Sequence, residues 1–223
     1  MSYPINYPTP QNANVQIFNA GDASNKGILG WTKPQGASFV WFTLIGGGAS
    51  GDGAAGGGSG AVTNFMCPAF LIPDFLEIVV GGGGEYPNNG TNSRVYYVNQ
   101  GGATYYSELL SAQGGTAGGN GGTAMTANFF TAMGFFQSIA GQVGSTGTVT
   151  ASNTTFLSGG GQTGNQTSNY GYTTGSTGNR NGFFQMQPII VGAGGMGIAN
   201  GGMGCGGGTN GDGGNGLVVI ITW

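Results

Sequence analysis

The stretch GAGGMGIANGGMGCGGGTNGDGGNGLVVIITW, residues 192–223, joins the most glycine-rich part of the chain to its most apolar terminal run. From 192 to 216, every third position is glycine except Ile198 and Asn210. A left-handed extended helix has three residues per turn, so this period leaves one edge of bare backbone that can pack against another such helix. We therefore predict structural glycines in this stretch, namely Gly192, Gly195, Gly201, Gly204, Gly207, Gly213 and Gly216.

The composition predicts an ordered chain despite its glycine content. Glycine accounts for 52 of the 223 residues, against a usual share of about 7 %. Disordered chains carry excess charge and few aromatic residues. Here only 5 % of the residues are charged and 11 % are aromatic, and the apolar residues cluster in strand-like runs. We conclude that the glycine blocks belong to a folded architecture.

The charged residues argue against several classes of function. The net charge is −3, and the four cations are Lys26, Lys33, Arg94 and Arg180. Binding to nucleic acid or to an anionic membrane surface requires a larger cationic footprint. The chain has no histidine, its carboxylates are scattered, and no cluster of metal ligands is visible. We therefore expect neither catalysis nor a cofactor nor a metal site.

Glycines 192, 194 and 197 satisfy the G-x-G-x-x-G pattern of dinucleotide-binding loops. That pattern requires a following helix, which the glycine-rich sequence after Gly197 cannot form. We therefore reject a nucleotide site. For Cys67 and Cys205 we expect two buried free thiols, although a disulfide between them stays an alternative. The N-terminus shows no secretory signal, so synthesis in a cytoplasm is expected.

The apolar runs alternate with the glycine blocks and read as strands. About eight to ten strands are expected, and the clearest candidates are residues 15–20, 38–45, 61–66, 75–80, 94–98, 104–110, 183–191 and 217–223. Residues 125–139 are the one helical candidate, because their apolar residues fall three or four apart. That stripe consists of Met125, Phe129, Met133 and Phe136.

The predicted fold is mainly β with at most one short helix. We expect a β-sandwich or jelly-roll-like base, with glycine-rich extended segments of polyglycine II type emerging at one end. Residues 1–15 read as an extended attachment arm, and residues 16–223 as a single glycine-rich β domain. Within that domain, residues 141–182 read as an exposed polar loop. Residues 217–223 are expected to form a central strand that locks the last glycine segment in place.

Several motifs, in order, resemble the glycine-rich domain of bacteriophage tail-fibre and other virion surface proteins. They are W-T-x-P-x-G (31–36), L-I-G-G-G (44–48), G-G-G-S-G-A (56–61), I-V-V-G-G-G-G (78–84) and D-G-G-N-G-L-V-V-I-I-T-W (212–223). The resemblance covers roughly residues 27–223. It implies a β-structured base with glycine-rich segments at the exposed end of a viral fibre or spike. Some related phage adhesins pack such segments as polyglycine II helices and display variable loops for host recognition.

The expected function is therefore that of a bacteriophage virion protein, part of a tail fibre or capsid spike that contributes to host attachment. The candidate receptor-contact residues are Tyr170, Tyr172, Arg180, Phe183 and Phe184, which alternatively anchor a loop to the sheet. Expected partners are other virion proteins, bound through the N-terminal arm, further copies of the chain, with a trimer favoured, and a host-surface glycan or protein. Two other readings stay open, namely a purely structural fibre or capsid-decoration protein and an ice-binding protein.

Overall fold

The computed structural model describes residues 13–21, 28–98, 106–144, 200–208 and 210–223. These residues form nine β-strands and two short 3-10 helices, without an α-helix in the described ranges. The strands are β1 (Asn14–Asn19), β2 (Ile28–Thr32), β3 (Phe39–Ile45), β4 (Val62–Pro68), β5 (Phe75–Val79), β6 (Ser93–Val98), β7 (Tyr106–Ala112), β8 (Phe135–Ile139) and β9 (Leu217–Thr222). The 3-10 helices are η2 (Ala69–Leu71) and η3 (Thr131–Met133).

The strands form two antiparallel sheets that face each other as a sandwich. One sheet has five strands in the order β1-β9-β3-β4-β8, and the other has four in the order β2-β5-β6-β7. In the second sheet, the pairing of β6 with β7 shifts register between Val95 and Tyr96. The mainly β, sandwich-like fold predicted from the sequence is thus confirmed.

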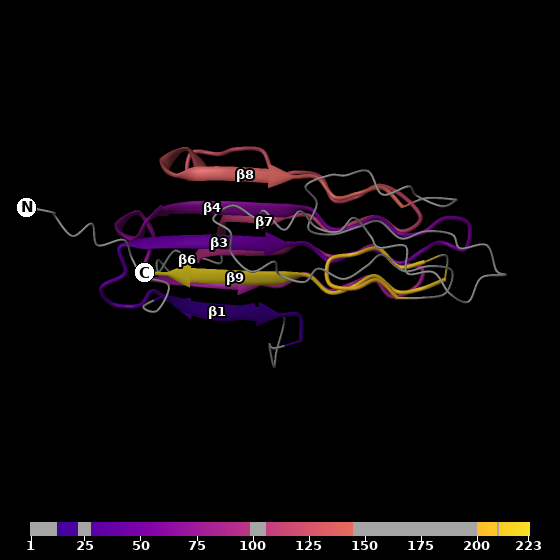
Figure 1. Ribbon diagram of the computed structural model, residues 1–223, viewed down its shortest axis with the longest axis horizontal. Coiled ribbons are helices and arrows are strands. Elements are labelled where there is room, and N and C mark those ends of the chain that lie inside the picture. The colour runs from indigo at the N-terminus through magenta and orange to yellow at the C-terminus, as the bar shows by residue number, and fades with distance from the viewer. Residues whose placement is uncertain (1–12, 22–27, 99–105, 145–199, 209) are drawn as a thin grey trace, which may run out of the picture.

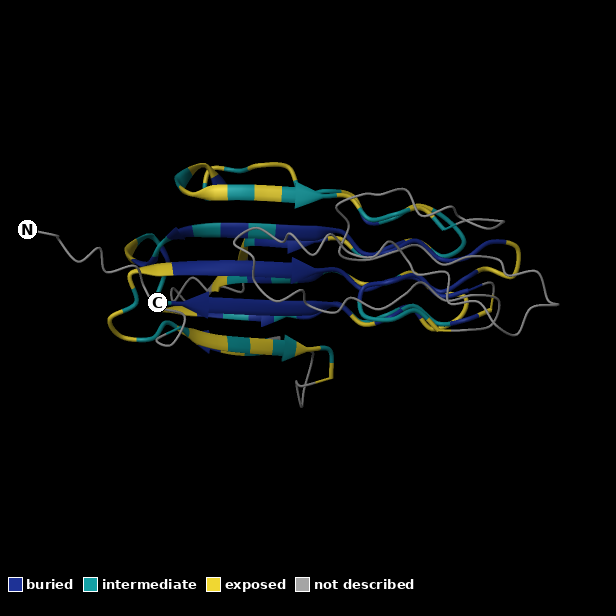
Figure 2. Cartoon of the chain, in the orientation of Figure 1, coloured by how far each residue is buried: buried dark blue, intermediate teal, exposed yellow. Residues whose placement is uncertain are grey.

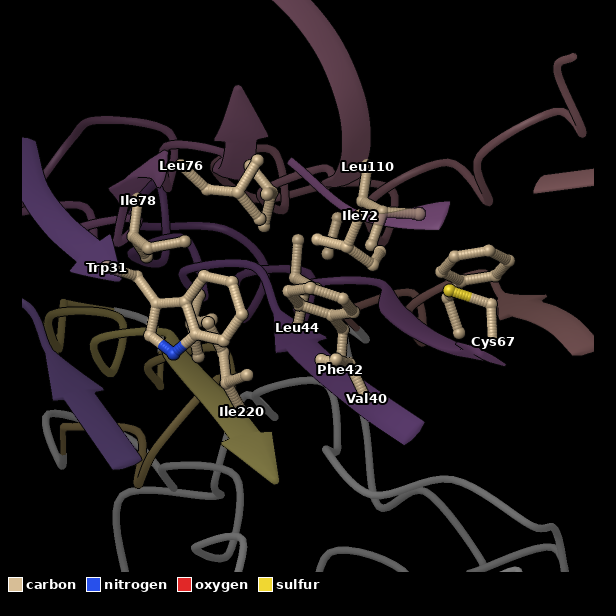
Figure 3. Packing of buried hydrophobic residues seen from close by; sticks show 14 of the residues in the cluster. Trp31, Val40, Phe42, Leu44, Cys67, Ile72, Leu76, Ile78, Leu110 and Ile220 are labelled. Carbon is tan, nitrogen blue, oxygen red and sulfur yellow. The ribbon is translucent and has the colours of Figure 1, made fainter. Parts of the chain in front are cut away.

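Apolar side chains from both sheets interlock between the two layers. Successive side chains of a strand point to opposite faces, so one alternate set of β3 and β9 faces the four-stranded sheet. Trp31 of β2 is 1 % exposed, and its ring meets that of Phe42 of β3 edge-on, with 6.1 Å between centroids. Figure 3 shows these rings beside Leu44, Leu76 and Ile220. This cluster is the main core.

Strand β9 lies in the interior of the larger sheet, between β1 and β3. All six of its residues are buried, so both of its faces are covered. On the face away from the main core, a second apolar cluster contains Trp41, Ile45, Val219 and Ile221. The prediction of a central C-terminal strand is confirmed, and burial on both faces explains why the run LVVII is continuously apolar.

The glycine-rich segments gather at one end of the sandwich. Figure 1 shows them extending beyond the strands, whereas Trp223 lies at the opposite end. At that opposite end Asn14, the first residue of β1, pairs with Thr222, the last residue of β9. Figure 2 shows buried backbone along much of the glycine segments and exposed residues where they turn. We call the sheet end the base and the glycine-rich part the array.

Two sequence-based expectations need correction. Residues 125–139 are not a helix, because they form only the short η3 and then strand β8. Met125 and Phe136 of the predicted apolar stripe pack against the main core, but Phe129 is 86 % exposed, so the four residues do not form one core-facing stripe. Strand β2 was not among the strands expected from the sequence, although it pairs with β5 along its whole length.

The predicted domain limits can be compared with the structure only in part. Strand β1 begins at Asn14, so the last two residues of the predicted arm 1–15 belong to the larger sheet. Residues 1–12 and most of the predicted loop 141–182 lie outside the described residues. Their assignments stay predictions.

Candidate functional site

The array is held together by backbone hydrogen bonds with a three-residue period. In the segment 46–51, residues three apart donate to the same neighbouring segment, and consecutive residues donate to three different ones. The bonds to carbonyl oxygens are Gly46 to Ala61 (2.9 Å), Gly47 to Thr91 (3.0 Å), Gly48 to Gly214 (2.8 Å), Ala49 to Gly58 (2.9 Å), Ser50 to Asn88 (3.2 Å) and Gly51 to Gly211 (3.1 Å). A helix with three residues per turn and no internal hydrogen bonds produces this pattern when neighbours surround it.

The return segment 57–61 repeats the arrangement with a different set of neighbours. Its N–H groups donate to three further segments, again with a period of three. The acceptors are Gly207 for Gly57 (2.9 Å), Thr116 for Gly58 (3.1 Å), Gln142 for Ser59 (2.9 Å), Gly204 for Gly60 (2.8 Å) and Gln113 for Ala61 (2.8 Å). The two segments therefore lie inside a bundle of polyglycine II type, and their buried backbone groups are satisfied by other backbone.

The packing of the bundle explains why glycine is required. A Cβ added to Gly48 would lie closer than 3.0 Å to the carbonyl oxygen of Cys205. One added to Gly57 would meet the carbonyl oxygen of Ala49 in the same way, and one added to Gly83 that of Gly213. Because backbone cannot move aside as a flexible side chain can, these positions exclude every residue with a Cβ.

The C-terminal glycines lie in the array, but not as one continuous helix. Two turns interrupt them: Cys205 N–H donates to the Gly202 carbonyl oxygen at 2.8 Å, and Gly211 N–H donates to the Gly208 carbonyl oxygen at 3.0 Å. Added Cβ atoms would meet backbone oxygens at four of the predicted positions, namely Gly201, Gly207, Gly213 and Gly216. Gly204 instead has a φ of +67°, which side chains rarely adopt. Gly192 and Gly195 lie outside the described residues.

Four turns meet at the end of the array farthest from the base, and we call this surface the distal tip. They are formed by residues 52–55, 85–89, 117–119 and 208–211, of which Thr209 is outside the described residues. Cross-links between turns fix their relative positions. Asn89 Oδ1 accepts from Ala117 N–H at 2.7 Å, and Asp212 Oδ1 accepts from Tyr86 N–H at 2.8 Å.

The distal tip presents one aromatic ring with polar groups around it. Tyr86 is 46 % exposed, and its hydroxyl lies 3.3 Å from the position of a Cβ built on Gly53. The Asn210 Oδ1 atom lies 3.7 Å from the same position, so the two polar groups flank Gly53. Exposed Glu85 and Asn88 belong to the same turn as Tyr86. Such a surface suits stacking and hydrogen bonding to an uncharged polar ligand.

Asp52 orders the turn that contains Gly53. Its Oδ1 atom accepts hydrogen bonds from the N–H groups of Ala55 (2.8 Å) and Ala54 (2.9 Å). These bonds favour the ionised form, so they hold the pKa of the Asp52 carboxyl below its ordinary value. The distal tip therefore carries a fixed negative charge at neutral pH.

The two cysteine side chains are not part of the distal tip. Cys67 and Cys205 are both buried and are not joined by a disulfide, which confirms the expected buried thiols. Burial raises the pKa of the Cys67 thiol to about 12. In the described ranges, no group of three metal-ligating side chains occurs, and no helix is long and apolar enough to cross a membrane.

The predicted receptor-contact residues Tyr170, Tyr172, Arg180, Phe183 and Phe184 all lie outside the described residues, so their role stays a prediction. Sequence reasoning missed the distal tip. The sequence does contain one indication of it, because DGA (52–54) and EYPNN (85–89) are turn sequences that directly follow glycine segments. What no pattern shows is that these turns meet in space.

Comparison with known proteins identifies the family of the chain. A model described as glycine-rich domain matches residues 23–223. No curated protein matches the chain. The matched region contains every described strand except β1, together with the whole array. The chain therefore belongs to the glycine-rich domain family.

Proposed function

We propose that this chain is a structural protein on the virion surface of a bacteriophage, part of a tail fibre or capsid spike, and that its distal tip contributes to host attachment. The resemblance of the chain's sequence motifs to those of phage fibre proteins supports the proposal, and these motifs lie within the residues matched by the glycine-rich domain. In this role the chain is a binding protein without catalytic activity.

The observation that carries the proposal is the polarity of the molecule. Strand β1 begins at Asn14, at the base, whereas the turns of residues 52–55 and 85–89 lie at the far end of the array. A domain fixed to a particle through its base presents the distal tip outward. Binding residues are commonly held on loops above a rigid scaffold, and the hydrogen-bonded array is such a scaffold.

The chemistry of the distal tip indicates the class of ligand. A tyrosine ring offers a large contact area at small entropic cost, and asparagine side chains both donate and accept hydrogen bonds. Tyr86 and Asn210 supply these groups beside the bare backbone of Gly53. We propose a host-surface glycan as the ligand, since sugar rings combine an apolar face with many hydroxyl groups.

Binding of labelled full-length protein to a panel of bacterial cells tests the proposal. We expect saturable binding to at least one strain, reduced about tenfold or more by Tyr86→Ala, which corresponds to about 1.4 kcal/mol. Tyr97→Ala is the matched control, because Tyr97 is 37 % exposed but lies on β6 toward the base. The proposal is wrong if no strain is bound, or if both variants reduce binding equally.

A purely structural role is the second candidate. It is favoured by the exposed apolar residues of β1, where Val15 is 52 % and Ile17 is 58 % exposed. In this case the protein would assemble with itself or with other virion proteins, and cells would not be bound. The cell-binding experiment therefore separates the two candidates.

A further inference from the structure

Among the described strands, β1 is an edge strand of the larger sheet. It pairs with β9 along its whole length, and no other described strand pairs with it. Alternate N–H and C=O groups of an edge strand point outward, where they can pair with another strand. Natural edges are commonly protected by lysine, proline or a bulge. The sequence NVQIFN of β1 has neither charge nor proline, and its pairing with β9 is regular.

The side chains of β1 make this edge attractive to another strand. Val15 and Ile17 lie on the outer face of the sheet, opposite Ile221 and Val219 of β9, and both are more than half exposed. Phe18 points the other way and packs against the main core. An exposed, uncharged edge with β-branched residues is the type of strand that recruits a partner by β-augmentation.

We infer that β1 pairs antiparallel with β1 of a second copy of the chain, about a two-fold axis at Gln16. This pairing joins the two five-stranded sheets into one continuous sheet. Val15 of each copy then lies opposite Ile17 of the other, on the same outer face. Self-pairing of one surface about a two-fold axis is the commonest form of homodimer.

The side chains favour an axis at Gln16 over one at Ile17. Residues directly opposite each other in an antiparallel pair lie on the same face, so only every second register keeps the outer faces together. An axis at Gln16 matches both exposed branched side chains with apolar partners. An axis at Ile17 would place Val15 opposite the amide of Asn19, so Val15 would have no apolar side chain opposite it.

The absence of charge on β1 favours a second copy as the occupant. Two identical strands repel each other when they carry charge, and NVQIFN carries none. A single strand pair buries a small area, so a reversible, concentration-dependent dimer is expected. A dimer differs from the trimer expected from the sequence, and the measured mass distinguishes the two.

Sedimentation equilibrium of the full chain over a wide concentration range tests the inference. The wild type is expected to approach twice the 22.2 kDa chain mass, and Ile17→Lys to stay monomeric with an unchanged circular dichroism spectrum. Val143→Lys is the matched control, since Val143 is also 58 % exposed but lies in the array, and it should dimerise like the wild type. A wild-type monomer up to about 1 mM, a trimer, or a dimer unaffected by Ile17→Lys would each overturn the inference.

Disulfide trapping tests the register itself. Under oxidising conditions Gln16→Cys should give a cross-linked dimer, because opposed Cα atoms in an antiparallel pair lie about 4.5–5.5 Å apart. In Asn14→Cys the two cysteines would be four residues apart along the strands, about 13 Å, and should not cross-link. Cys67 and Cys205 are buried and add no background. Equal cross-linking of both variants, or none of either, would overturn the pairing about Gln16.

Discussion

The hydroxyl of Ser93 donates a 2.6 Å hydrogen bond to the carbonyl oxygen of Ile45, at the level where the two sheets meet the array. Ser93 begins β6 of the smaller sheet, and Ile45 ends β3 of the larger one. The same hydroxyl accepts from the N–H of Gly81 at 2.9 Å, where the glycine segment after β5 begins. One fully buried side chain thus joins both sheets to the array.

Replacement of Ser93 should therefore destabilise the fold. Ser93→Ala leaves the Gly81 N–H without its acceptor in a buried site, which costs about 1–3 kcal/mol of the free energy of unfolding. Urea unfolding measures this loss. Ser107→Ala is the control, because Ser107 is an exposed residue of strand β7. Equal losses in the two variants would show that the hydroxyl does not stabilise the junction.

Trp31 should contribute through its volume and not through its indole N–H. The side chain is 1 % exposed, and Nε1 has no hydrogen-bond partner among the described residues. We expect Trp31→Ala to lose about 3–5 kcal/mol of stability and Trp31→Phe less than half of that. Chemical denaturation of both variants provides the comparison. A loss for Trp31→Phe as large as that for Trp31→Ala would contradict this account.

The charge of Asp52 should make stability depend on pH in the acidic range. Because its pKa is lowered in the folded state, its contribution is complete above the unfolded value, near 3.8, and is lost as the pH falls through the lower folded value. Asp52→Asn cannot ionise. Hence the Tm difference between wild type and variant should be constant from pH 7 to about 5 and should shrink below about pH 4. A difference that grows on acidification would have the wrong sign.

The two thiols should not react in the native protein. Both are buried, and the pKa of Cys67, raised to about 12, leaves almost no thiolate at pH 8. A chromogenic disulfide reagent should therefore label no cysteine quickly in native protein and both cysteines after denaturation. Fast labelling of one thiol without denaturant would show that the core or the array opens readily.

The strands of the sandwich core could be predicted from the sequence because their residues are distinctive. Residues 38–45 and 217–223 are continuous β-branched and aromatic runs bounded by glycine or proline, and both are interior strands. Strand β2 was missed because ILGWT contains Gly30 and follows a turn-rich stretch, which lowers its apparent strand propensity. Its pairing with β5 supplies the stability that its own sequence lacks.

The prediction of a helix over residues 125–139 was wrong for a related reason. The spacing of Met125, Phe129, Met133 and Phe136 imitates an amphipathic helix, but Gly134 interrupts it. A Cβ at Gly134 would lie closer than 3.0 Å to the carbonyl oxygen of Met66, so the chain approaches β4 closely and continues as its neighbour β8. Tertiary pairing decided the structure of this segment.

The type of helix in the array could be predicted from the sequence, but not which glycine segments lie next to each other. The three-residue glycine period indicated packed extended helices, and the hydrogen bonds of residues 46–51 have that period. The order of strands in the two sheets determines which array segments are hydrogen-bonded to each other. It also determines that Tyr86 and Asn210 lie close together at the distal tip. Local sequence does not contain this information.

The central claim, that the glycines are packed architecture, is tested most directly by two adjacent alanines. A Cβ at Gly83 would collide with the Gly213 carbonyl oxygen, whereas one at Gly82 would meet only Thr91 Oγ1, at 3.7 Å. Gly83→Ala should lose about 3 kcal/mol and lower the Tm by about 6–12 °C. Gly82→Ala should change the stability by less than about 1 kcal/mol. Equal melting temperatures for the two variants would contradict close packing of the array.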